Sequence, residues 1–160
     1  MNHNDIRDTE KIRPAVPADA VTISRFQEQM AKETEGMTLD AEVVGKGVNS
    51  IFEDSSRGIY YVLEVEGRII ASLLITYEWS EWRNGQVWWI QSVYVEKDFR
   101  GHGIFKRLYA YIQSLAASDE NICGIRLYVD NTNTAAQKVY QSIGMNGDHY
   151  KVYEWMKSKR

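Results

Sequence analysis

The pattern of apolar and polar positions predicts most of the helices of this chain. Apolar residues recur at spacings of three and four over 103–118, which places them on one face of an amphipathic helix. The same period predicts helices over 17–33 and 133–143. A further helix is predicted to begin after Thr38, a good N-cap residue, and to run to about residue 53.

Alternating runs that are rich in β-branched and aromatic residues predict the strands. They cover residues 12–14, 58–66, 68–78, 87–96, 122–129 and 149–155. The polar segment 79–86 contains Asn-Gly and predicts a turn. The fourth and fifth strands flank a helix and should be parallel, whereas the first three should be antiparallel. The fold class is therefore α/β, with a central mixed sheet of six or seven strands and helices on both faces.

Composition narrows the classes of protein that this pattern allows. The chain has 160 residues, of which 44% are hydrophobic, so it suits one domain with a sizeable core. We assign this domain to residues 11–160 and expect a flexible tail over 1–10. The net charge of −3 gives no general attraction to nucleic acid. The N-terminus lacks the apolar core of a signal peptide, and no apolar stretch could span a membrane, so we expect a cytoplasmic protein without a membrane partner.

Two features carry candidate chemistry. The loop from Phe99 to Gly103 holds two glycines and leads into the helix over 103–118. Unpaired N–H groups at the start of that helix, with the positive end of its dipole, form a seat for phosphate. The loop therefore predicts a phosphorylated small molecule or cofactor as ligand. Cys123, the only cysteine, is expected to be buried in a strand rather than to act as a nucleophile.

Two motifs resemble those of the GNAT superfamily of acyl-CoA-dependent N-acetyltransferases. Residues 100–105 read Arg-Gly-His-Gly-Ile-Phe, where the family has Gln/Arg-x-x-Gly-x-Gly/Ala at the start of a helix. Residues 133–140 read Asn-Thr-Ala-Ala-Gln-Lys-Val-Tyr, which is similar to the family's Asn-x-x-Ala-x-x-Leu-Tyr on the next helix. The resemblance covers about residues 11–156, and the layout is most similar to the diamine and polyamine acetyltransferase branch.

The resemblance implies that acetyl-CoA binds along the fourth strand and at the glycine loop, without a metal. Backbone groups of Val93 and Val95 would pair with the pantetheine arm as an added strand does. Backbone N–H groups from Gly101 to Lys106 would hold the pyrophosphate. The implied cofactor-binding residues are Val93, Tyr94, Val95, Arg100, Gly101, His102, Gly103, Ile104, Phe105, Lys106 and Asn133. Phe105 stands where the family prefers Gly or Ala, and we expect its side chain to pack in the core.

Acyl transfer to an amine needs a neutral amine, a stabilised oxyanion and a proton for the leaving thiolate. The resemblance implies that Tyr140 supplies this proton, and a core tyrosine is the alternative. A backbone N–H just after Gln91 is expected to stabilise the oxyanion. The polyamine branch has a glutamate where this chain has Gln91, so deprotonation runs through water or through another carboxylate. Glu78 is the catalytic candidate, and Glu81 is a second carboxylate that could serve.

The acceptor site is expected at two loops that carry acidic and aromatic residues. Glu33, Glu81 and Trp82 are the candidate substrate residues. Carboxylates beside tryptophans suit a cationic amine through charge and cation–π attraction. Tryptophans are also enriched at protein interfaces, and family analogy implies a homodimer, so both roles stay open.

The sequence thus predicts an N-acetyltransferase that moves an acetyl group from acetyl-CoA to a primary amine of a small cationic molecule. The reaction would be a direct attack in a ternary complex. Two alternatives stay open. The acceptor could be a protein or peptide amine, or the chain could be a non-catalytic acyl-CoA-binding sensor. Gln91 and Phe105 favour the sensor, and Tyr140 disfavours it.

Overall fold

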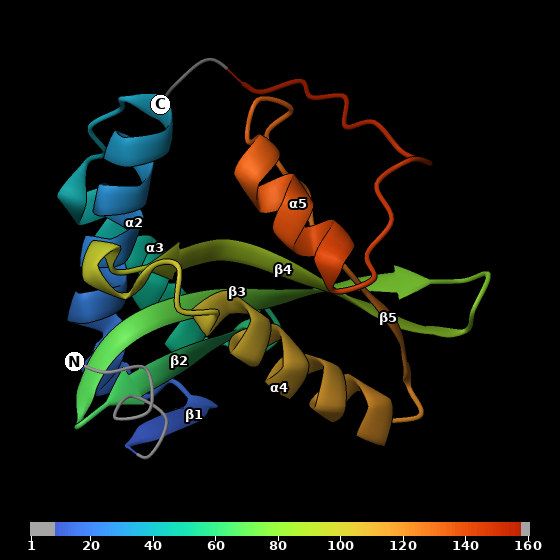
Figure 1. Cartoon of the computed structure of the whole chain (residues 1–160), viewed down its shortest axis with the longest axis horizontal. Helices are drawn as coiled ribbons and strands as arrows, with labels where there is room; N and C mark the ends of the chain where they lie inside the picture. Colours follow the sequence, from blue (N-terminus) through green and yellow to red (C-terminus); the bar gives the residue numbers. More distant parts are fainter. Residues whose placement is uncertain (1–8, 158–160) are drawn as a thin grey trace. The chain divides into compact units, whose positions relative to one another are not determined.

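One mixed sheet holds the strands of the chain in their sequence order (Figure 1). This computed structural model describes residues 9–157, and within them the sheet has five strands in the order β1-β2-β3-β4-β5. Their bounds are β1 (Glu10–Pro14), β2 (Ile59–Val65), β3 (Arg68–Ser80), β4 (Gly85–Val95) and β5 (Ile122–Arg126). The pairs from β1 to β4 are antiparallel, and β5 is parallel to β4. The predicted mixed sheet and its parallel last pair are therefore confirmed.

Helices precede and connect these strands. Their bounds are η1 (Pro17–Asp19), α2 (Ala20–Glu35), α3 (Ala41–Glu53), η2 (Lys97–Phe99), α4 (Ile104–Ser118) and α5 (Thr134–Ser142). The chain forms two compact units, one that ends at Leu127 and contains the sheet, and one that begins at Tyr128 and contains α5. The prediction of a single domain over 11–160 stays a prediction. Residues 1–8 of the predicted tail lie outside the described residues, whereas Glu10, its last residue, belongs to β1, where it pairs with Val65.

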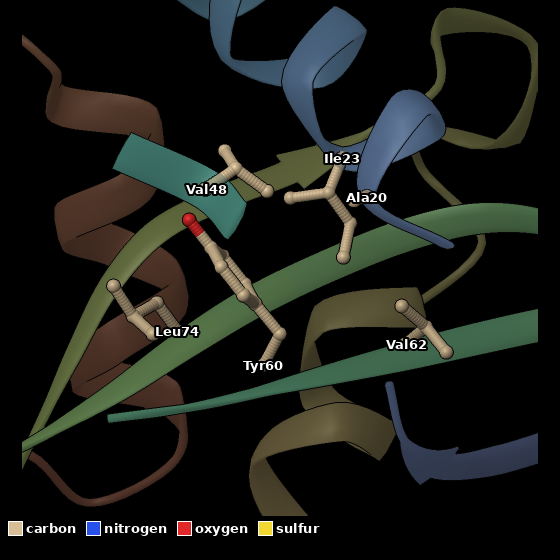
Figure 2. Close-up of a cluster of buried hydrophobic side chains, with 6 residues drawn as sticks. All are labelled: Ala20, Ile23, Val48, Tyr60, Val62 and Leu74. Atoms are coloured by element: carbon tan, nitrogen blue, oxygen red, sulfur yellow. The ribbon is translucent and has the colours of Figure 1, made fainter. Parts of the chain in front are cut away.

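Helices α2 and α3 cover one face of the sheet through a cluster of buried apolar side chains (Figure 2). The members of the cluster are Ala20, Ile23, Val48, Tyr60, Val62 and Leu74. Tyr60 and Val62 are two positions apart on β2, so both point to this face. Burial raises the pKa of Tyr60 to about 12, which shows how far its phenol is removed from water.

Helix α4 covers the opposite face of the same sheet, as Figure 1 shows. Tyr61 lies between the two residues that face α2 and α3, and its ring meets that of Tyr111 of α4 at a centroid distance of 5.9 Å. Leu108 and Ile112, one turn apart on α4, are fully buried. The prediction of helices on both faces is confirmed. Successive side chains of a strand point to opposite faces, so each face of the sheet presents side chains for helices to cover.

The predicted strand over 149–155 does not form, so the sheet has five strands rather than six or seven. Tyr153 and Trp155 in this segment are 90% and 83% exposed. An alternating sequence forms a strand only where a neighbouring strand accepts its hydrogen bonds and packs its side chains. Residues 149–155 have the pattern but no such neighbour within the described chain.

The predicted turn over 79–86 is shorter in the structure, because β3 continues to Ser80 and β4 begins at Gly85. These two residues are opposite one another in the ladder, which leaves a turn over 81–84. A Cβ on Gly85 would lie 2.4 Å from Cys123 Sγ and 2.8 Å from the Asn121 carbonyl oxygen. Glycine is therefore needed here because the start of β5 approaches the backbone closely.

Two smaller predictions are also wrong. The N-cap of α3 is Asp40 and not Thr38, because the Asp40 carboxylate accepts hydrogen bonds from the backbone N–H groups of Glu42 and Val43. Cys123 is exposed and not buried, because it lies on β5, the edge strand of the sheet, which has a neighbouring strand on one side only. The apolar run that begins at Ile122 pairs as a strand only to Arg126.

Candidate functional site

A bulge bends β4 near its C-terminal end. Between the pairs Leu74–Gln91 and Ser72–Tyr94, β3 advances by two residues and β4 by three, so β4 carries one extra residue. Ser92 takes a positive φ of 52°, which is uncommon for a residue other than glycine. The bulge interrupts the regular ladder just after Gln91. The oxyanion role of a backbone N–H at this position stays a prediction.

Strands β4 and β5 separate beyond the bulge. Their parallel pairing ends at Trp89 and Arg126, whereas β4 continues to Val95. Among the described residues, no strand pairs with 90–95 on that side. Unpaired N–H and C=O groups on a strand edge form a template for an extended ligand. The predicted pairing partners Val93 and Val95 lie on this open edge.

The loop after β4 holds two glycines in the left-handed conformation. Gly101 has a φ of 79° and Gly103 a φ of 72°, and Gly103 is the N-cap of α4. No side chain caps this helix, and its first intrahelical bond runs from the Arg107 N–H to the Gly103 carbonyl. The N–H groups of the first turn therefore have no partner within the helix, which makes them donors for an anion.

Residue Arg107, which the sequence analysis did not single out, holds this loop from the other side. Its guanidinium pairs with both carboxylate oxygens of Glu10 on β1, at 2.8–2.9 Å. It also donates to the His102 carbonyl at 2.7 Å. The His102 ring turns back on the loop, with Nδ1 at 2.9 Å from the Arg100 carbonyl. The His102 ring thus contacts its own loop, and its predicted cofactor role stays a prediction.

The side chains after Gly103 follow the amphipathic pattern of α4. Ile104 is buried, Lys106 is exposed, and Phe105 is half-buried with its ring 6.2 Å from the ring of Tyr109. The aromatic side chain at position 105 thus finds an apolar neighbour on its own helix.

A cavity of about 270 Å³ lies between α2, the end of β4 and the loop. Its lining residues are Met30, Glu33, Thr34, Val93, Tyr94, Val95 and Arg100. The cavity therefore brings together Glu33, a predicted substrate-binding residue, and four predicted cofactor-binding residues. The Tyr94 ring itself points to α2, where it lies 4.9 Å from the ring of Phe26.

Charged groups converge on Glu33 at the mouth of this cavity. Arg100 Nη2 donates to Glu33 at 2.7 Å, the Tyr94 hydroxyl donates at 3.1 Å, and Lys97 Nζ lies at 3.5 Å. Burial alone would raise the pKa of Glu33, but the donors and the two cations outweigh it and hold the pKa below its usual range. Burial and the nearby Glu33 carboxylate raise the pKa of Tyr94. Glu33 is therefore ionised and Tyr94 protonated at neutral pH.

A second polar group crosses β3, β4 and β5. Glu78 accepts hydrogen bonds from the Trp89 indole N–H and from Arg126 Nη1, the latter at 2.7 Å. Gln91 Nε2 donates to Thr76 Oγ1 at 2.6 Å. Alternation along β3 places Thr76 and Glu78 on the face that α2 and α3 cover, the face of Glu33. Arg126 and Thr76 were missed because only the strand register brings them here.

The other two candidate substrate residues lie elsewhere. Glu81 and Trp82 are in the turn between β3 and β4, and Trp82 is 88% exposed. A strand rises about 3.3 Å per residue, so the length of β4 from Gly85 to Val93 separates the turn from the cavity by roughly 25 Å. The structure does not bring Glu81 and Trp82 to the cavity.

The second unit contains the remaining two site residues. Asn133 is the N-cap of α5, and its side-chain oxygen accepts from the Ala136 N–H at 3.0 Å. Tyr140 is half-buried, and burial raises its pKa, so its phenol is protonated and able to donate at neutral pH. Gly144, with a φ of 86°, follows the end of α5 as predicted. The cofactor role of Asn133 and the acid role of Tyr140 stay predictions.

Residues 9–157 contain neither a cluster of metal ligands nor a membrane-spanning helix. No group of three or more His, Cys, Asp or Glu side chains there could hold a metal ion. None of the helices in this part of the chain combines the length and the hydropathy that crossing a membrane requires.

A splayed, bulged strand that leads through a glycine loop into an uncapped helix is the arrangement of an acyl-CoA-dependent acyltransferase. The model of the acetyltransferase (GNAT) family matches residues 23–145, and the chain belongs to this family. The predicted superfamily is thereby confirmed, whereas the polyamine branch is not. A comparison with curated proteins gave no significant match.

Solved structures with the same fold include a possible acetyltransferase from Clostridium difficile 630. It is 44% identical, with a TM-score of 0.88, and the match covers 94% of this chain and 99% of the other. An aminoglycoside acetyltransferase from an uncultured soil sample, in complex with sisomicin, is 16% identical, with a TM-score of 0.75 and coverages of 96% and 99%. A predicted acetyltransferase with acetyl-CoA from Clostridium acetobutylicum is 18% identical, with a TM-score of 0.71 and coverages of 91% and 96%. The last two show the likeness of fold alone.

Proposed function

We propose that this acetyltransferase moves an acetyl group from acetyl-CoA to a primary amine of a small cationic molecule, in a ternary complex. The observation that carries the proposal is the open edge of β4, which ends at the glycine loop and a cavity. The carboxylates of Glu33 and Glu78 lie on the same face of the sheet. Carboxylates near the reacting thioester favour a cationic acceptor over a neutral or acidic one.

The open edge fits the cofactor that the family uses. Amide groups of the pantetheine arm would pair with Val93 and Val95, and the phosphates would bind the N–H groups from Gly101 to Lys106. This pairing would place the thioester near the bulge at Ser92. A backbone N–H that has left the ladder there would stabilise the carbonyl oxygen as it becomes negative.

The reaction that we propose is a direct displacement. The lone pair of the amine nitrogen attacks the carbonyl carbon of the thioester, the C–S bond breaks, and the products are an N-acetylated amine and the free thiol. The acceptor arrives as an ammonium, so its nitrogen first releases one proton to solvent to free the lone pair. It loses a second proton as the amide forms, which Glu78 would accept through a bridging water. The leaving thiolate gains one proton, which the Tyr140 phenol would donate.

Glu78 suits this role by its position. It is bonded to Trp89, which is two residues from Gln91 on the same face of β4, so a water molecule could connect the two positions. Gln91 itself donates to Thr76 and carries no proton-accepting carboxylate. The base is therefore a neighbour of the position where the polyamine branch has its glutamate.

Release of the thiol from acetyl-CoA with a panel of acceptors tests the proposal. The panel contains polyamines, aminoglycosides, amino acids and N-terminal peptides, because each presents a different amine. We expect turnover with small polycationic amines and little with peptides. Turnover with peptides alone would mean that the acceptor is a protein or peptide amine. Binding of acetyl-CoA without turnover on any acceptor would favour the acyl-CoA sensor.

A further inference from the structure

Arg100 binds two groups that the proposed ligands would need. One is the Val95 carbonyl oxygen, which a bound acyl-CoA would use, and the other is the Glu33 carboxylate, which a bound amine would use. The Arg100 Nε donates to the Val95 carbonyl oxygen at 2.8 Å. The next N–H, of Glu96, donates to Ile70 on β3 at 2.9 Å. Because C=O and N–H of a trans peptide point in opposite directions, the Val95 carbonyl points away from β3, to the open edge. Arg100 therefore covers an acceptor on the edge that the pantetheine arm would pair with.

The other half of the Arg100 guanidinium holds Glu33. Nη2 donates to Glu33 Oε2 at 2.7 Å, and the guanidinium carbon lies 5.3 Å from the centre of the Tyr94 ring. The side chains of Arg100 and Glu33 are 43% and 23% exposed. An ion pair that is open to solvent contributes little net stability, so another anion can displace Glu33 from Arg100 at low cost. A phosphate group is such an anion, since it binds a guanidinium through charge-assisted and often bidentate hydrogen bonds.

Release of Arg100 would change the charge balance of the cavity. Glu33 would keep the Tyr94 hydroxyl at 3.1 Å and Lys97 Nζ at 3.5 Å, and Lys97 is 69% exposed. Its closest cation would be gone, and one oxygen of its carboxylate would face the cavity of about 270 Å³. A carboxylate in this state attracts a protonated amine more strongly than one that is paired with a guanidinium.

We propose that the Glu33–Arg100 ion pair is a latch that the phosphates of acyl-CoA open, and that the released Glu33 then holds the ammonium end of the cationic acceptor. Glu33 is thus a positioning residue that couples the two substrates. The inference rests on the proposed function, because it needs an acyl-CoA and a cationic amine in one site. Coupling between binding sites is reciprocal, so each ligand should tighten the other by the same factor.

Calorimetric titration with free CoA and with spermidine tests the latch without turnover, since free CoA carries no acetyl group. In the wild-type protein, we expect saturating CoA to tighten spermidine binding about fivefold or more. Glu33→Gln removes the competitor for Arg100, so it should bind CoA several-fold more tightly than the wild type. In this variant, CoA should no longer change the affinity for spermidine.

Glu35→Gln is the matched control, because it removes the same charge from an exposed position two residues further along α2. It should leave both the CoA affinity and the coupling unchanged. Equal or weaker CoA binding by Glu33→Gln would overturn the latch, as would spermidine binding that does not depend on CoA in the wild type. If the wild type does not bind CoA at all, the proposed function fails and the latch fails with it.

Discussion

Glu78 shows how a single side chain at this site is positioned by three strands. It belongs to β3, its donor Trp89 to β4 and its donor Arg126 to β5. The two donors fix the orientation of the carboxylate beside the stretch of β4 that precedes the bulge. Orientation of this kind matters for catalysis, because a general base acts only within hydrogen-bond reach of its proton or through one water.

At this scale we expect Glu78→Gln to lower the turnover about 10²-fold, because the amide retains a hydrogen-bond acceptor for Arg126 but accepts no proton. Glu81→Gln, in the turn between β3 and β4, is the matched control and should leave turnover unchanged. Thiol release at saturating acetyl-CoA measures both. Unchanged turnover in both variants would show that neither carboxylate acts as the catalytic base.

Tyr140→Phe should lower the turnover about 10²-fold or more with little change in the affinity for acetyl-CoA, because the change removes only the hydroxyl that would protonate the thiolate. The matched control is Tyr128→Phe in the same unit, which removes a hydroxyl from an exposed side chain. Steady-state kinetics and CoA titration separate the two effects. Unchanged turnover in Tyr140→Phe would assign Tyr140 to packing alone.

At the scale of elements, the site depends on where two strands pair and where they separate. β5 approaches β4 closely at its start, next to Gly85, and pairs with it as far as Trp89. From there the bulge at Ser92 bends β4 away, and the open edge begins. The length of the paired stretch therefore decides where the open edge begins, and the end of β4 at Val95 decides where it stops.

Gly85→Ala should destabilise the protein by about 1–3 kcal/mol, because its Cβ would lie 2.8 Å from the Asn121 carbonyl oxygen, a backbone atom that cannot rotate away. The control is Gly124→Ala on β5, where a Cβ meets nothing within 4 Å. Urea unfolding with a common slope for all variants measures the difference. A Gly85→Ala variant as stable as Gly124→Ala would contradict the close approach of β5.

At the scale of the whole sheet-containing unit, ion pairs tie the first strand to both faces. Arg13 on β1 pairs with Asp19 at 2.7 Å, just before α2, and with Glu64 on β2 at 2.9 Å. Glu10 on the same strand pairs with Arg107 of α4 at 2.8 Å. A short edge strand is thereby fixed to the helices on both sides of the sheet, in addition to its ladder with β2.

The Arg13–Asp19 pair predicts a loss of stability in acid. Burial alone would raise the pKa of Asp19, but hydrogen bonds from Arg13 and the Val16 N–H outweigh it and hold the pKa below its usual range. The folded state therefore binds the proton less readily than the unfolded state. The stabilisation is complete above the unfolded pKa of about 3.9 and is lost as the pH falls through the lower folded pKa.

Asp19→Asn should therefore cost about 1–3 kcal/mol at pH 7, and the difference from the wild type should shrink below about pH 4. Glu42→Gln is the control, because its carboxylate is 77% exposed in a surface pair with Lys46 and should contribute little at any pH. Thermal unfolding from pH 3 to pH 7 measures both. A constant difference for Asp19→Asn over this range would contradict the role of its charge.

The sequence alone predicted the elements around the glycine loop and the class of the protein. Helical period, β-branched runs and glycines at positive φ act over a few residues, so α4, β4 and the loop with Gly101 and Gly103 could be found locally. The same local pattern also predicted a strand over 149–155 that does not form, because no neighbour pairs with it in the described chain.

Only the tertiary structure decided which charged side chains meet. Glu33 and Arg100 are 67 residues apart in the sequence, Glu78 and Arg126 are 48 apart, and Glu10 and Arg107 are 97 apart. Many residues of opposite charge could pair with a long charged side chain, and the local sequence does not show which one does. Strand register and helix packing bring one of them within reach. The sequence therefore determined that this chain is an acetyltransferase of the GNAT family with a glycine loop before α4. The fold determined that the loop's arginine is held by a carboxylate from α2.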